Sequence, residues 1–174
     1  DIEKRATVHN LITARSGVYH AASNGGDDLA RAPERGSQEP GTYMLYNNWD
    51  FNAAGAAFEY FTGRSIYDEL QAQLAIPLQF QDWDRSVHRK SGNLSISVNP
   101  AYHMHFSTRD MARIGHLMLN EGNWDGRQVI SQDWARQIVS VVTPLVPPHP
   151  LPEIVLQPGP LPPAPIFLRV IAPS

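Results

Sequence analysis

Apolar residues recur at helical spacing in five segments of the chain. In the first segment, apolar side chains stand at positions 8, 11 and 12, which share one face of a helix. In the fourth, apolar residues at 111, 114 and 118 again fall on a single helical face. The pattern predicts helices over residues 6–15, 50–61, 66–74, 108–119 and 132–141.

Residues with strong preferences for helix ends bound these segments. Serine caps a helix with its side-chain oxygen, and Ser65, Ser107 and Ser131 each precede a predicted helix. Gly63 follows the second helix, at the position where a left-handed backbone commonly ends one. Pro77 stops the third helix because proline has no backbone N–H to donate.

The segments between the helices show little strand-like alternation. Residues 21–41 are rich in Gly, Asp, Pro, Ser and Glu, which predicts a long surface loop. Residues 78–100 alternate weakly and contain the turn signals Ser91-Gly92-Asn93 and Asn99-Pro100, so short strands or irregular ribbon are expected. Residues 128–130 are expected to be extended.

Proline dominates the end of the chain. Eleven of the fifteen prolines fall within residues 144–174. Because proline fixes φ and lacks a donor, this stretch is predicted to be extended or disordered, with polyproline II character. The chain is therefore divided into a folded region, residues 1–143, and a proline-rich tail, residues 144–174.

Composition narrows the classes of function. The formal net charge of −3 offers no basic surface for nucleic acid or for an anionic membrane. The absence of cysteine excludes a disulfide, a thiol nucleophile and a cysteine-based zinc site. No apolar run approaches the roughly 20 residues of a membrane span. The first six residues have neither the basic start nor the apolar core of a signal peptide, so the compartment is not indicated, and the chain is expected to begin inside a longer sequence.

The triplet Tyr46-Asn47-Asn48 stands between an extended approach and the predicted helix at 50–61. This order places a phenol and an amide at a strand–loop–helix corner, where polar groups can face a cleft while the helix behind them is buried. Two plainer interpretations stay open. Tyr46 can be a core tyrosine with a satisfied hydroxyl, and Asn48 can cap the following helix.

Six segments in order carry a resemblance to a known family. They are His9–Gly17, Tyr46–Asn48, Phe61–Gly63, Ile76–Leu78, Ser107–Gly115 and Gly122–Ser131. Together they resemble the serine β-lactamase-like superfamily, in particular its branch of class C β-lactamases, DD-peptidases and family VIII esterases. The resemblance implies an α/β fold with helices around an antiparallel sheet. Most of that sheet is expected to come from segments outside this chain, so these residues should form its mainly helical portion, with exposed apolar surface that favours self-association.

The resemblance also implies a chemistry. Such enzymes cleave a small-molecule β-lactam, D-Ala peptide, ester or related amide through an acyl-serine, and no cofactor is expected. A Ser-x-x-Lys pair provides the nucleophile; by resemblance Tyr46 assists the proton transfer, and Asn48 helps hold the substrate or the lysine. A serine hydroxyl is a poor nucleophile until a base takes its proton, and a phenol with a pKa near ~10 is a poor base until cations lower that pKa. Members of the family are often periplasmic or secreted.

The chain departs from this pattern at the nucleophile. No serine is followed by a lysine three positions on, and we expect that pair to lie upstream of Asp1. The strand motif Lys-Thr-Gly or His-x-Gly, expected after residues 132–141, does not occur there. Lys90-Ser91-Gly92 is similar but precedes the Ser107 helix, so a surface turn explains it better. We therefore expect an internal part of a serine hydrolase that is inactive as this chain alone. A truncated or frame-shifted reading, in which residues 144–174 are not native sequence, stays open.

Two alternatives remain open. The chain can be a non-catalytic relative that binds or scaffolds other molecules, with the proline-rich tail as the ligand of an aromatic-lined groove. A metal hydrolase would have to use His103 and His105, which lie two positions apart, but no third ligand is indicated and no metal site is predicted.

Overall fold

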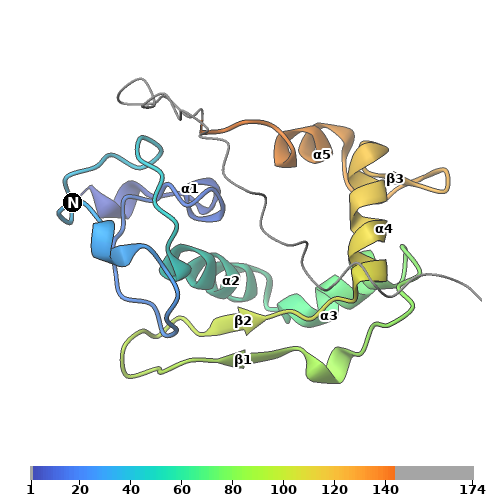
Figure 1. Cartoon of the computed structure of the whole chain (residues 1–174), viewed down its shortest axis with the longest axis horizontal. Helices are drawn as coiled ribbons and strands as arrows, with labels where there is room; N and C mark the ends of the chain where they lie inside the picture. Colours follow the sequence, from blue (N-terminus) through green and yellow to red (C-terminus); the bar gives the residue numbers. More distant parts are fainter. Residues whose placement is uncertain (1, 144–174) are drawn as a thin grey trace, which may run out of the picture. The chain divides into compact units, whose positions relative to one another are not determined.

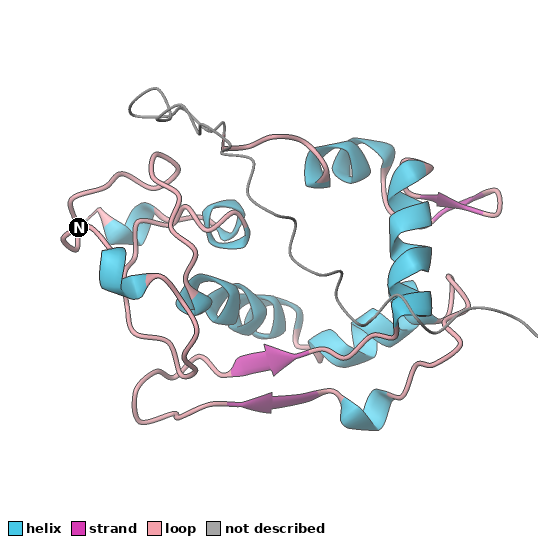
Figure 2. Cartoon of the chain, viewed as in Figure 1, coloured by secondary structure: helices cyan, strands magenta, loops and turns pink. Residues whose placement is uncertain are grey.

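The computed structural model describes residues 2–143, and the predicted tail at 144–174 lies outside the described residues. The described part is a mixed α/β structure in which helices predominate and strands are short (Figures 1 and 2). The helices are α1 (Val8–Ile12), α2 (Asn48–Thr62), α3 (Ile66–Leu70), α4 (Thr108–Leu119) and α5 (Gln132–Ile138). The strands are β1 (Arg89–Ser91), β2 (Ala101–His103), β3 (Asn123–Trp124) and β4 (Arg127–Gln128).

The prediction of five helices is confirmed, and α4 has the predicted limits. Helix α2 begins at Asn48, two residues before the predicted start, because Asn47 caps it. It ends where Gly63 adopts the predicted left-handed backbone, with φ 68°. Helix α5 ends at Ile138, earlier than its apolar pattern suggested. Among residues 2–143, no helix combines the length and the apolar character needed to span a membrane.

The other two helices are shorter than their periodicity predicted. Helix α1 ends at Ile12 because Ala14 takes a left-handed backbone, with φ 53°, which reverses the chain. Helix α3 ends at Leu70 and passes into a wider π turn over Gln71–Ala75, just before Pro77. Apolar spacing alone does not report either change, because both depend on backbone geometry at the helix end.

Two of the three predicted serine caps are confirmed. Ser107 and Ser131 accept hydrogen bonds from the backbone N–H of the third residue of α4 and α5, at 3.1 Å and 3.3 Å. Ser65 makes no such bond, so the prediction of its cap is wrong. A carboxylate from the end of α2 takes its place, because Glu59 Oε1 accepts from the N–H of Ile66 at 3.3 Å.

The strands form two separate two-stranded antiparallel sheets within residues 2–143. Strands β1 and β2 pair with Lys90 opposite Tyr102, which confirms the short ribbon predicted for the region before α4. Strands β3 and β4 form a hairpin whose turn, Asp125-Gly126, has φ values of 50° and 81°. So little paired strand agrees with the mainly helical portion of a larger fold that the sequence predicted.

Helix α2 joins the N-terminal segments to the β1–β2 ribbon. It lies between α1 and β2 (Figure 1). Gly55 lets the ribbon approach closely, since a Cβ there would stand 2.5 Å from the ring of Tyr102. The hydroxyl of Tyr102 donates to Glu59 Oε2 at 3.1 Å, and Lys90 forms an ion pair with the same carboxylate. Glu59 therefore fastens both strands to the helix.

The start of α4 is anchored by a buried carboxylate. Asp110 is 1% exposed, and its two oxygens accept from the backbone N–H groups of Gln81 and Asp82 at 2.9 Å and 3.2 Å. Leu78 and Leu117, both fully buried, contribute the apolar part of this region. The backbone N–H groups of this loop are thus satisfied by a side chain of helix α4.

The close contact of Gly55 with Tyr102 predicts a stability effect. Gly55→Ala should lower the free energy of unfolding by up to about 2 kcal/mol, because overpacking costs ~1–3 kcal/mol against a gain of ~1 kcal/mol in helix propensity. Gly115→Ala is the matched control, because nothing lies within 4 Å of its Cβ position in α4. That variant should be stabilised by about 0.5–1 kcal/mol. Urea denaturation of both variants checks this, and equal effects would contradict the packing role.

Candidate functional site

The approach to Tyr46 is held by the segment that follows α1. The N–H of Gly41 donates to the carbonyl of Arg15 at 2.7 Å, and the N–H of Leu45 donates to the carbonyl of Ala14 at 2.9 Å. Gly41 has φ 91°, a backbone conformation that a residue with a Cβ rarely adopts. These contacts, together with the cap of α2, bring Tyr46 to the start of that helix.

Asn47, and not Asn48, caps α2. Its Oδ1 accepts from the N–H of Asp50 at 2.8 Å, and its Nδ2 donates to the carbonyl of Leu45 at 3.2 Å. The interpretation of Asn48 as a helix cap is therefore wrong. Asn48 is the first residue of the helix, and its amide remains available for other partners.

The structure brings Tyr46 and Asn48 together. The Tyr46 hydroxyl donates to Asn48 Oδ1 at 3.3 Å, and Asn48 Nδ2 donates to the carbonyl of Gly25 at 2.7 Å. Tyr46 is 43% exposed, so the interpretation of it as a buried core tyrosine is wrong. Its ring packs against that of Phe51, with the centroids 5.7 Å apart. The pair thus presents a phenol and an amide at the surface, on a rigid helix start.

The predicted loop at 21–41 contributes to the same corner. Besides the Gly25 carbonyl, the N–H of Asp28 donates to the carbonyl of Tyr46 at 3.1 Å. Asp27 accepts from a backbone N–H two residues on, at 3.3 Å. The loop therefore buttresses the backbone of the corner from one side.

A buried polar cluster lies behind the corner, and sequence reasoning missed it. Asp50 is 0% exposed, and its Oδ1 accepts from the hydroxyl of Ser16 at 2.6 Å. Burial raises the pKa of Asp50 to about 6, although the hydrogen bonds from Ser16 and Asn47 oppose that rise. The signal in the sequence was an acidic residue in the first turn of a predicted helix. By itself this suggests a favourable interaction of the carboxylate with the helix dipole, and not a buried site.

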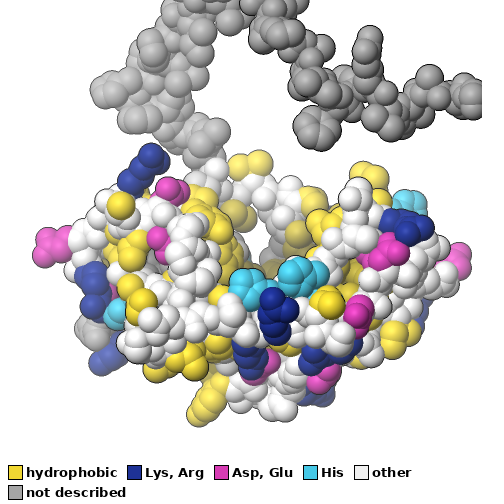
Figure 3. Space-filling view, turned by 60° about the horizontal axis from the view of Figure 1, so that its bottom comes forward, with side chains coloured by type: hydrophobic (Ala, Val, Ile, Leu, Met, Phe, Trp, Pro, Cys, Tyr) yellow, Lys and Arg dark blue, Asp and Glu magenta, His cyan; other side chains and the backbone are white. Residues whose placement is uncertain are grey.

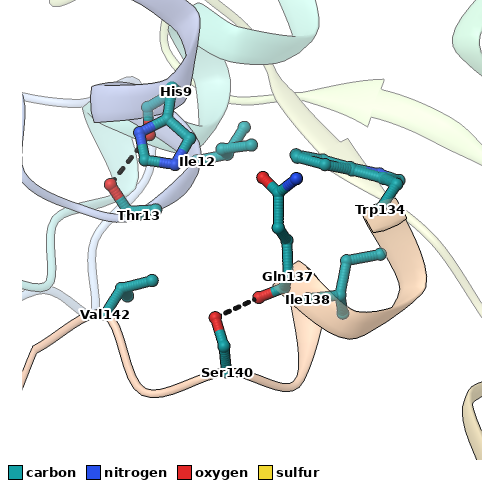
Figure 4. Close-up of a pocket in the computed structure, with 8 residues that line it drawn as sticks. All are labelled: His9, Ile12, Thr13, Trp134, Gln137, Ile138, Ser140 and Val142. Atoms are coloured by element: carbon teal, nitrogen blue, oxygen red, sulfur yellow. Dashed lines mark hydrogen bonds between the residues drawn. The ribbon is translucent and has the colours of Figure 1, made fainter. Parts of the chain in front are cut away.

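Two apolar cavities of about 370 Å³ each lie on the described part of the chain. The first is bordered by α1 and by residues of α5, whose Trp134 and Gln137 face Ile12 across it (Figure 4). The second lies along α2 and β2 and includes Phe51, the ring that packs against Tyr46. Ile12 borders both cavities. Hydrophobic side chains likewise border a hollow in the face shown in Figure 3.

The remaining candidates lie away from this corner. Lys90 is paired with Glu59, and Ser91 is hydrogen-bonded to His103, so both act within or beside the ribbon. The N–H of His105 donates to the Nδ1 of His88 at 3.2 Å. Within residues 2–143, no three His, Cys, Asp or Glu side chains are grouped so that they could hold a metal ion.

Comparison with protein families identifies a relationship. A family model described as Beta-lactamase matches residues 2–147 of the chain, a range that contains the whole of the corner and both cavities. No curated protein matches the chain.

The buried carboxyl predicts a pH dependence of stability. Because the pKa of Asp50 is raised from 3.8 to about 6, the folded state binds its proton more tightly than the unfolded chain does. The stabilisation is full below the unfolded pKa and is lost as the pH rises through the folded pKa. The advantage of the wild-type chain over Asp50→Asn should fall by about 2.4 kcal/mol between about pH 4 and about pH 7.

Urea denaturation across that range measures this difference. Asp110→Asn is the control, because it replaces an equally buried carboxyl elsewhere and should leave the dependence due to Asp50 in place. Parallel stability curves for the wild type and Asp50→Asn would show that the carboxyl does not carry the effect.

Proposed function

The chain belongs to the beta-lactamase family, and we propose that it supplies the tyrosine side of an acyl-transfer site in a serine hydrolase. The observation that carries this proposal is the exposed Tyr46 hydroxyl, hydrogen-bonded to Asn48 at the start of α2. Tyr46 would assist proton transfer, and Asn48 would hold the substrate or the lysine that accompanies the nucleophile.

The geometry of the corner supports these roles. A group that moves a proton must be accessible and rigidly placed. The Tyr46 hydroxyl meets the first requirement because the side chain is 43% exposed. The Phe51 ring, the Asn48 amide and the backbone bond from Asp28 restrict its ring and main chain. Asn48 in turn is tied to the carbonyl of Gly25 and keeps its oxygen directed at the phenol.

The reaction needs partners that these 174 residues do not contain. In the proposed acylation, a serine hydroxyl attacks the carbonyl of the substrate while its proton passes to a base, and that proton then goes to the departing amine or alcohol. No Ser-x-x-Lys pair occurs in the chain. We therefore propose that polypeptide outside residues 1–174 supplies the serine and the lysine. The substrate class is a β-lactam, a D-Ala peptide, an ester or a related amide.

This assignment predicts that the chain of residues 1–174 is inert toward acylating probes. Incubation with a fluorescent penicillin and with a fluorophosphonate, followed by denaturing gel electrophoresis, should give no label above that of heat-denatured chain. Stable labelling that requires the folded chain and disappears in Tyr46→Phe would contradict the assignment, because a nucleophile would then be present.

The coding DNA separates this function from the non-catalytic alternative. An in-frame Ser-x-x-Lys upstream of Asp1, or a Lys-Thr-Gly or His-x-Gly in another frame downstream, supports the acyl-transfer site. A complete gene without either motif supports a relative that binds or scaffolds other molecules. The predicted interaction tail of that alternative lies outside the described residues.

We also propose that the isolated chain self-associates through the apolar surface around Ile12. This side chain is 40% exposed and borders both cavities. Val8 and Phe51 on the same surface are also exposed. A continuous apolar area of this kind is favourably removed from water by contact with another chain.

Ile12→Lys should weaken that self-association by at least about tenfold, because it replaces an apolar contact worth ~1.5–3 kcal/mol by a charge. Leu119→Lys is the matched control: Leu119 is more exposed, at 84%, but borders neither cavity. Sedimentation equilibrium over a range of concentrations measures both. Equal weakening by the two variants, or a wild-type chain that stays monomeric, would rule out this surface.

A further inference from the structure

A hydrogen-bonded carboxyl lies directly behind Tyr46 and Asn48. Asp50 Oδ1 accepts from the Ser16 hydroxyl at 2.6 Å, and Oδ2 accepts from the Ser16 N–H at 3.4 Å. The Ser16 oxygen also accepts from the N–H of Val18 at 2.9 Å. Asp50 and Ser16 are 0% and 1% exposed, and the carboxyl has no ion-pair partner within residues 2–143. A buried carboxyl depends on such hydrogen bonds.

Asp110 provides an internal comparison. Both acids are the third residue of a helix, and in both cases the backbone N–H bonds to the side chain of the cap residue. Asp110 accepts from two backbone N–H groups and so anchors a loop. Asp50 accepts hydrogen bonds instead from the side chain and backbone of Ser16, which is 34 positions away. A hydroxyl can reverse its role when the carboxyl gains a proton, whereas a backbone N–H cannot.

We propose that Asp50 is a positioning residue for the tyrosine corner: through Ser16, its carboxyl fixes where the start of α2 presents Tyr46 and Asn48. This inference rests on the proposed acyl-transfer function for its relevance, but not for its geometry. Asp50 follows Asn48 by two positions in the first turn of α2. Ser16 likewise lies two positions after Ala14, whose carbonyl accepts from the N–H of Leu45, next to Tyr46. The Ser16–Asp50 bond therefore joins the two segments between which Tyr46 is held.

Protonation of the carboxyl would change this bond. Asp50 would gain an O–H donor on one oxygen, and the bond that Ser16 makes to that oxygen would weaken or reverse its direction. Because burial raises the pKa of Asp50 to about 6, the change falls close to neutral pH. The corner should therefore report the charge of Asp50 through a shift in the surroundings of Tyr46.

Other ionisable groups face the same cluster. Tyr19, whose pKa is raised by burial, interacts with Asp50 and with Tyr43. His20 packs on the indole that precedes Asp50, with the ring centroids 5.0 Å apart. The guanidinium of Arg15 donates to a backbone carbonyl at 2.6 Å, near the end of the described residues. His20 lies beside the residue that precedes Asp50, so it needs its own control.

The experiment follows the nuclear magnetic resonance signal of Tyr46 in the full chain with isotope-labelled tyrosine ζ carbons. Tyr46→Phe assigns the signal among the six tyrosines. In the wild type the Tyr46 signal should move with a midpoint at about pH 6. Asp50→Asn should abolish that movement, and Asp110→Asn and His20→Gln should retain it. Ser16→Ala should raise the midpoint, because the bonds from Ser16 lower the pKa.

Several results would overturn the proposal. A wild-type Tyr46 signal that does not move between about pH 5 and about pH 7 excludes the coupling. An unchanged movement in Asp50→Asn, or its loss in His20→Gln or Asp110→Asn, assigns it to another group or to general loosening. If Asp50→Asn does not fold, an unaltered midpoint in Ser16→Ala overturns the proposal alone. None of these measurements requires catalysis, so they stand apart from the probe-labelling test of the proposed function.

Discussion

The hydrogen bond from Ser16 to the buried carboxyl of Asp50 is the constraint on which the candidate site depends. A carboxyl that is 0% exposed is destabilising unless donors surround it. Ser16 and the capped start of α2 therefore have to lie side by side, and the chain between them has to bring residue 50 back to residue 16. Tyr46 lies at the end of this connecting segment, just before α2. The position of an exposed phenol is thus decided by a bond in the interior.

Helix α2 transmits this placement to the rest of the described residues. Its first turn carries Asn48 and Asp50, its middle approaches β2 at Gly55, and Glu59 near its end holds both strands of the ribbon. Small residues in the middle of the helix allow the close approach, and a single carboxylate near its end satisfies Tyr102 and Lys90. The site and the ribbon are therefore fixed to one rigid element.

The apolar surface next to Tyr46 and the absence of a Ser-x-x-Lys pair from the chain have the same proposed explanation. Tyr46 contacts Phe51, Phe51 borders a cavity, and Ile12 connects that cavity to a second one beside α5. A phenol and an amide cannot by themselves cleave an ester or amide substrate, since they provide no competent nucleophile at neutral pH. The chain belongs to the beta-lactamase family, and we propose that its active site is divided between this chain and further polypeptide. Such a division would leave an apolar surface exposed beside an incomplete site.

The sequence by itself determined the features that depend on neighbouring residues. The five helices, the limits of α4, the serine caps of α4 and α5 and the Gly63 terminus all follow from periodicity and local hydrogen bonding. The Tyr-x-Asn triplet also marked the corner, and its order among the other matched segments indicated the family later identified by comparison.

Only the tertiary structure decided which polar groups meet across the chain. Glu59 displaced Ser65 as the partner of the α3 N-terminus because the turn at Gly63 folds α2 back toward it. Asp50 became a buried acid with a raised pKa because Ser16, distant in sequence, packs against it. Local patterns cannot report such pairs, since burial and hydrogen bonding depend on where two remote segments come together.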